Sequence, residues 1–237
     1  LFFANLIPKP RVRGFNAGDT TQMKNILKAL AVALLMAATV IPATAKKPFL
    51  SEKEQAKIEK AAEKEAKKTA KEKKKEGWKV EQTGLMENII ARHIVKRETE
   101  GLQEKNGAAT DHKSRSGCRK QILNDVSNAY AREVSQVIRG EITSKDRFRD
   151  GDEAEDFIGQ YETRLAAEIA GELVESYSLY KKNPDGTFDM EIYYFIDPDR
   201  AHDAKLRAAR NSMELQKLDE EWCKSISDAI NGTRDED

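Results

Sequence analysis

The chain has 237 residues, of which 41 are Lys or Arg and 41 are Asp or Glu, so its formal net charge is zero. Nucleic-acid-binding proteins are usually strongly basic, so this balance leads us to expect no nucleic-acid partner. Charged residues make up 35% of the chain and aromatic residues 7%, which predicts a modest core and large solvated helical faces.

Residues 23–45 read as an export signal. A short basic start is followed by an apolar run of about 13 residues and by a small-residue site that ends at Ala45, the order typical of a secretory signal peptide cleaved after that residue. The alternative is an uncleaved anchor, although a spanning helix needs roughly 20 apolar residues. Because a signal peptide should begin a protein, residues 1–22 are interpreted as an upstream extension of the gene model. We expect a periplasmic or secreted protein with no stable transmembrane span after cleavage.

The segment 46–76 is dominated by charge. It holds twelve lysines and seven glutamates, and alanine supplies most of its apolar stripe. These residues favour a helix, with Ser51 as N-cap and Glu54 at the capping-box position. Because the stripe is thin, we expect an exposed spacer helix that precedes the main domain at 77–231. The alternative is a basic arm that binds a polyanion or cell-wall polymer, with possible contacts at Lys67, Lys68, Lys71, Lys73, Lys74 and Lys75.

The main domain opens with a predicted strand and three predicted helices. Residues 78–83 alternate as a short strand, and residues 85–94 have apolar side chains at helical spacing. The polar segment 99–116 is predicted to be a loop. Two amphipathic helices are expected next, at 118–138 with Gly140 beyond its end, and at 157–169.

The hydrophobic period then changes from 3.6 to 2. Residues 173–180 and 188–196 are predicted to form a hairpin around the turn sequence Asn183-Pro184-Asp185-Gly186. One long last helix is expected, capped by Asp199, with a buried stripe at Ala201, Ala204, Ala208, Leu215, Leu218, Trp222, Ile226 and Ala229. Residues 232–237 form an acidic tail. The predicted class is α+β, a small antiparallel sheet of one N-terminal strand plus the hairpin, packed by amphipathic helices on one face.

The sequence at 171–177 (GELVESY), a glycine turn and the strand at 187–195 (TFDMEIYYF) follow a helix with an Ala/Val stripe. This order resembles the twenty-kilodalton bacterial envelope lipoprotein family and the related N-terminal domain of flagellar assembly protein T, over residues 77–200. The resemblance implies a helix packed on a small sheet, in a non-catalytic envelope module that works through protein contacts. The chain departs from the lipoprotein pattern because Lys46, not the lipid-bearing Cys, follows the cleavage site.

Few residues are candidates for chemistry. Asp197, Asp199, His202 and Asp203 could hold a metal ion or serve a hydrolytic enzyme, although Asp199 as a helix cap, with His202 and Asp203 in the first turn, is the better explanation of the cluster. Cys118 and Cys223 are a possible disulfide in an exported protein, or two small buried apolar residues. His93 is read as a residue of a helix face.

We therefore expect an exported, non-catalytic envelope protein that acts through contacts with an envelope protein partner and needs no cofactor. A metal-dependent or hydrolytic enzyme around 197–203 and a polyanion binder through 46–76 remain the alternatives.

Overall fold

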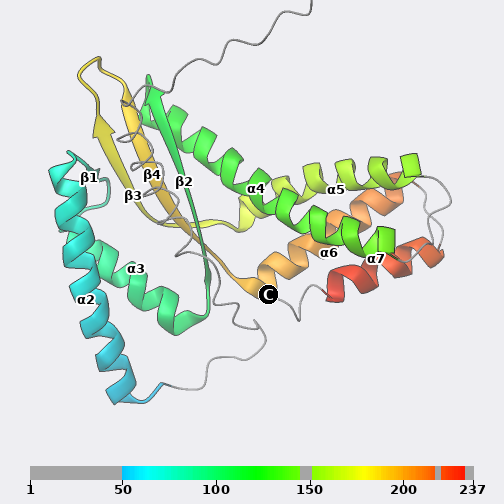
Figure 1. Ribbon diagram of the computed structural model, residues 1–237, viewed down its shortest axis with the longest axis horizontal. Helices are drawn as coiled ribbons and strands as arrows, with labels where there is room; N and C mark the ends of the chain where they lie inside the picture. The colour runs from blue at the N-terminus through cyan, green and yellow to red at the C-terminus, as the bar shows by residue number, and fades with distance from the viewer. Residues whose placement is uncertain (1–49, 145–150, 217–219, 233–237) are drawn as a thin grey trace, which may run out of the picture. The chain divides into compact units, whose positions relative to one another are not determined.

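The structure is a computed structural model that describes residues 50–144, 151–216 and 220–232. Within those ranges the chain has six helices and one four-stranded antiparallel sheet (Figure 1), which confirms the predicted α+β class. In chain order the elements are α2 (Glu52–Lys75), β1 (Lys79–Val80), α3 (Met86–Glu100), β2 (Gln103–His112), α4 (Arg115–Ser144), α5 (Gly151–Glu172), β3 (Val174–Lys182), β4 (Phe188–Ile196), α6 (Pro198–Gln216) and α7 (Glu220–Gly232).

The hairpin predicted from the alternating pattern is confirmed as β3 and β4. The strand order is β1-β3-β4-β2, and every neighbouring pair is antiparallel. In the turn, Asn183 N–H donates to Thr187 O over 2.8 Å, and Gly186 has φ of 89°, a left-handed conformation that glycine adopts without strain. The register of the hairpin therefore begins at a turn that its sequence specifies.

Helices cover both faces of the sheet, which corrects the expectation of a single covered face. Met190, Ile192 and Tyr194 of β4 are buried against α4. On the opposite face, Tyr177 and Leu179 of β3 are buried with α2 and α3. A further cluster of buried side chains joins α4 to α5, α6 and α7. The 30-residue α4 thus packs against the sheet with one part of its length and against the other helices with the rest.

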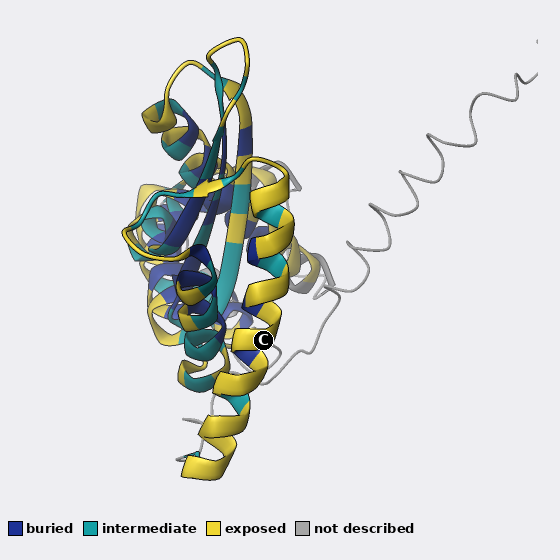
Figure 2. Cartoon of the chain, turned by 90° about the vertical axis from the view of Figure 1, so that its left-hand side faces the viewer, coloured by how far each residue is buried: buried dark blue, intermediate teal, exposed yellow. Residues whose placement is uncertain are grey.

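The expectation of an exposed spacer helix is wrong for the inner side of α2. Its helical structure and its capping box at Ser51 and Glu54 are confirmed. Ala62, Ala66 and Ala70 are at most 2% exposed and pack against α3 and β3. Alanine allows this because its small side chain lets two backbones approach closely, so a thin stripe still makes a tight contact. Figure 2 shows the exposed outer side of α2 and its buried inner positions.

The predicted loop at 99–116 is also wrong, because residues 103–112 form the edge strand β2. This strand pairs with β4 and lies against α4. A Cβ atom on Gly107 would lie 2.7 Å from Val126 Cγ2 and 2.8 Å from Ile122 Cγ2. The strand therefore needs glycine where α4 comes close, and its sequence lacks the apolar alternation that predicts a strand.

Replacing Gly107 by alanine is expected to destabilise the protein by about 1–3 kcal/mol, because the added methyl group overpacks two buried β-branched side chains. The matched control is Gly159→Ala in α5, where a Cβ would meet no atom within 4 Å. There alanine should raise the free energy of unfolding by about 0.5–1 kcal/mol, because it favours a helix more than glycine does. Urea unfolding of both variants measures the difference. Equal stability of the two variants would contradict the close packing of β2 on α4.

The C-terminal part of the chain differs in two ways from the single long helix predicted there. The structure has two helices, α6 and α7, and residues 217–219 lie outside the described residues. Leu215, predicted to be buried, is 60% exposed, whereas Ala208 and Ile226 are fully buried as predicted. Helix α4 also continues past Gly140 to Ser144.

Several predictions fall outside the described residues. They concern the extension at 1–22, the signal peptide at 23–45 with its cleavage at Ala45, Leu218, the side chain of Trp222 and the tail beyond residue 232. Within the parts of the chain that the structure describes, no helix is both long and apolar enough to cross a membrane.

Candidate anion-binding site

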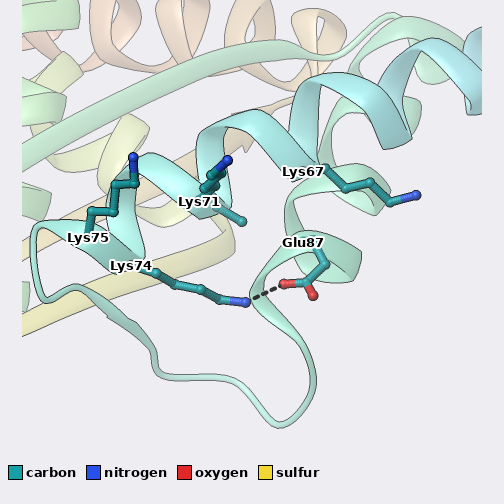
Figure 3. Close-up of a pocket in the computed structure, with 6 residues that line it drawn as sticks. Lys67, Lys71, Lys74, Lys75 and Glu87 are labelled. Carbon is teal, nitrogen blue, oxygen red and sulfur yellow. Dashed lines mark hydrogen bonds and ion pairs between the residues drawn. The ribbon is translucent and has the colours of Figure 1, made fainter.

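A pocket lined by lysines lies on the outer side of α2, where that helix meets α3. Its volume is about 470 Å³, and its lining residues are Lys67, Ala70, Lys71, Lys74, Lys75 and Glu87. Figure 3 shows the four lysines on α2 and the one carboxylate on α3. Four ammonium groups against one carboxylate give this pocket a net positive charge.

Helical geometry and the alanine contact together build this pocket. Residue 71 follows residue 67 by four positions, and residues 74 and 75 follow residue 71 by three and four, so their side chains share one side of α2. Ala70, between them in sequence, is 2% exposed because it faces α3. The packing of α2 therefore fixes the direction in which the lysines point.

Two lysines of the pocket are already paired, and Lys67 Nζ lies 3.7 Å from Glu63 Oε2 within α2. The Lys74 ammonium donates to Glu87 Oε2 over 2.7 Å, and this hydrogen bond lowers the pKa of Glu87. Glu87 therefore stays ionised and holds Lys74 in place across the two helices. Lys71 and Lys75 are exposed on the same side of α2, where they are positioned to contact an anion from solvent.

The structure separates the six lysines that the sequence marks as possible polyanion contacts. Lys67, Lys71, Lys74 and Lys75 line the pocket, and Lys68 is exposed beside them. Lys73 does not belong to this group, because it points to the sheet. Its ammonium pairs with Glu191 over 2.5 Å and lies 5.0 Å from the centre of the Trp78 ring.

The Asp197–Asp203 segment caps a helix, but with a different residue than predicted. Asp197 Oδ1 accepts the backbone N–H groups of Asp199 and Arg200 over 2.9 and 3.2 Å. The prediction that Asp199 is the cap is therefore wrong by two positions, and Asp199 lies in the first turn of α6. His202 is 7% exposed on the inner side of α6, whereas Asp203 is exposed.

No three His, Cys, Asp or Glu side chains of the described ranges are grouped so that they could hold a metal ion. The two cysteines are both thiols. Cys118 is fully buried among the side chains between α4 and β4, and burial raises the pKa of its thiol. Cys223 is partly exposed and packs against the separate cluster of α4 to α7. The structure therefore places the predicted disulfide partners in two different clusters.

A trio of side chains around the buried His93, which the sequence did not predict, lies between α3 and the sheet. His93 Nε2 is 3.0 Å from Glu104 Oε2, and His93 Nδ1 is 2.9 Å from Ser176 Oγ. Burial raises the pKa of Glu104, but hydrogen bonds from His93 and Arg97 outweigh it and lower that pKa. A carboxylate only accepts, so Nε2–H donates to Glu104, and in the neutral ring Nδ1 accepts from the serine hydroxyl.

A base between a hydroxyl and a carboxylate is an arrangement that can activate a nucleophile. Here the histidine is 4% exposed. Its ring stacks on Phe195 at 4.5 Å and meets the edge of Tyr177 at 4.9 Å. These ring contacts make His93 part of the core, where its two polar contacts join α3 to β2 and β3.

A second missed network lies on the other face of the sheet. The Arg119 guanidinium on α4 donates to Glu175 of β3 and to Glu81, which follows β1. Arg115 also reaches Glu81, over 3.0 Å. Both arginines sit on the first turns of α4, so the network ties that helix to the β1 edge of the sheet.

Comparison of the chain with protein-family models, with curated proteins and with solved structures found no match.

Proposed function

We propose that this chain is an exported, non-catalytic protein of the bacterial cell envelope that works through contacts with an anionic partner. The observation that carries the proposal is the pocket lined by Lys67, Lys71, Lys74 and Lys75 of α2, with Glu87 as its one lining carboxylate. Such a surface attracts anions through long-range Coulomb forces and holds them through charge-assisted hydrogen bonds.

Two features of the sequence support this proposal. The pattern at 23–45 favours export, which would bring the protein into contact with the anionic polymers, lipids and proteins of an envelope. The resemblance to envelope lipoproteins over residues 77–200 favours a module that binds other components. In this proposal the pocket is the contact surface, and the sheet with its helices keeps α2 in position.

A pair of charge-reversal variants tests the pocket. The protein that begins at Lys46 should bind tripolyphosphate in a calorimetric titration, and Lys71→Glu with Lys75→Glu should weaken binding at least about tenfold, because two of four ammonium groups become repulsive. Both side chains are exposed, so the fold should survive the change.

The control reverses the same amount of charge elsewhere, at the exposed residues Lys113 and Lys120. This control should bind tripolyphosphate as the unchanged protein does. If both double variants lose affinity equally, binding reflects net charge and the pocket has no special role. If the unchanged protein does not bind the anion, the proposed function is wrong. Crosslinking in the native envelope would then identify the true partner.

A further inference from the structure

The lysines of α2 extend far beyond the pocket in a regular line. Alternating steps of four and three residues separate seven lysines, and all seven are exposed. We define this lysine ridge as Lys53, Lys57, Lys60, Lys64, Lys67, Lys71 and Lys74. At a rise of 1.5 Å per residue the ridge is about 31 Å long.

The packing of α2 sets the ridge on its outer side. Successive residues of a helix are about 100° apart, which puts the ridge lysines roughly opposite Ala62 and Ala66. Both alanines are at most 1% exposed, against α3 and β3. The inner side of the helix is therefore mainly alanine, with Lys73 directed to the sheet, whereas the ridge lysines lie on the outer side.

The glutamates of α2 flank the ridge on both sides. Measured around the helix axis from the ridge, one row of glutamates lies roughly 80–120° to one side, and a second row lies roughly 100–120° to the opposite side. The rows are Glu52, Glu59 and Glu63, and Glu54, Glu65 and Glu72. Charge counted along the sequence is thus largely compensated, yet in space the positive charge forms one line between two negative borders.

The ridge leads into the pocket. A repeat of 3.5 residues falls behind the 3.6 residues of a helical turn by about 20° per heptad. The lysine line therefore turns slowly around α2 and reaches the α3 side near its C-terminal end. There Lys67, Lys71 and Lys74 line the pocket with Glu87 of α3. One continuous positive track runs from Lys53 to this pocket.

We infer that the lysine ridge binds a linear polyanion, a chain with repeated phosphate or carboxylate groups, along the axis of α2. This inference rests on the proposed function and specifies its partner. A single anionic strand can follow a line of lysines and avoid the glutamate rows, whereas a flat anionic membrane would face the rows as well. The exposed apolar positions of α2 are the alanines Ala56 and Ala61, and its one large apolar side chain, Ile58, is half-buried, so the ridge offers a bilayer no large apolar side chain to insert.

A charge exchange within α2 tests the ridge without changing composition. The variant carries Glu52→Lys, Lys53→Glu, Glu59→Lys and Lys60→Glu, four exposed positions outside the pocket. Net charge and helix-forming residues stay the same, but two lysines leave the ridge and two glutamates enter it. Circular dichroism should show the same helix content for both proteins.

The probe is long-chain polyphosphate, compared with tripolyphosphate, which is too short to reach beyond the pocket. The exchange variant should bind the long chain at least about tenfold more weakly and should lose roughly 1–2 units of the slope of log K against log salt, because two phosphate contacts disappear. Its affinity for tripolyphosphate should not change. A second long probe, polygalacturonate, distinguishes carboxylate polymers from phosphate polymers.

The control exchanges charge on α4, with Lys120→Asp and Asp125→Lys, both exposed positions, and should bind the long chain normally. Unchanged affinity and salt slope in the exchange variant of α2 would overturn the inference, even if tripolyphosphate binding confirms the pocket. Stronger binding to phosphatidylglycerol vesicles than to either polymer, lost in the same variant, would also overturn it and assign the ridge to a membrane. Failure of tripolyphosphate to bind any of these proteins would instead contradict the proposed function.

Discussion

Replacing Ala66 by aspartate is expected to release α2 from the rest of the protein. Ala66 has no exposed surface and lies in the middle of the alanine stripe that contacts α3. An unpaired carboxylate at this position costs at least about 3 kcal/mol if it stays buried, so detachment of α2 becomes the cheaper outcome. The released helix should be cut rapidly by trypsin at its many lysines, whereas the packed helix should resist.

The neighbouring Ala61→Asp variant is the matched control, because Ala61 is exposed on the same helix. This control should keep the unfolding midpoint and the tryptic resistance of the unchanged protein. The Ala66 variant should also lose polyphosphate binding, since the pocket requires α3 beside α2. If the unchanged protein and both variants are cut equally rapidly, α2 does not pack on α3, and the expectation of an exposed spacer helix would be correct after all.

The sequence was most informative where one period of hydrophobicity dominates. Five alternating apolar residues predicted β4 within its observed bounds, and the turn at Asn183–Gly186 fixed its pairing with β3. The capping box at Ser51 predicted where α2 begins. In these segments the local preference and the final packing agree, so local patterns were sufficient.

Strand β2 shows why the rest was missed. It is an edge strand that packs one face on α4, and the close approach of that helix requires glycine at position 107. The polar and glycine residues that look like a loop in sequence thus have a tertiary reason. Missing β2 also concealed the trio, because Glu104 lies on that strand and approaches His93 only in the folded protein.

The lysine pocket was only partly predictable. The sequence indicated the lysine-rich segment, and five of the six lysines named there are on the outer side of α2. A count of charges, however, treated the glutamates of the segment as cancelling the charge of the lysines. Burial of the alanines decides which way each charge points. An angular plot of the helix would have separated lysines from glutamates, although it could not have shown that Glu87 of α3 completes the pocket.

The second large effect is expected when His93 is replaced by alanine. The change removes a ring that stacks on Phe195 and leaves Ser176 and Glu104 without their shared partner. Loss of packing and of two hydrogen bonds should destabilise the protein by about 3–4 kcal/mol. Urea unfolding measures this, and His112→Ala near the end of β2, where the side chain is only half-buried, should cost clearly less.

The contact between His93 and Glu104 also predicts how the stability of the protein depends on pH. The pKa of Glu104 is lower in the folded protein than in the unfolded chain, so its ionised form stabilises the fold at pH values above about 4.3, the ordinary value for glutamate. That contribution is lost as the pH falls through the lowered folded value. The Glu104→Gln variant should therefore be less stable than the unchanged protein by about 1–2 kcal/mol at pH 7, and the gap should close on acidification. A gap that stays constant from neutral pH down to pH values below the folded pKa would show that the Glu104 carboxylate does not stabilise the fold through its charge.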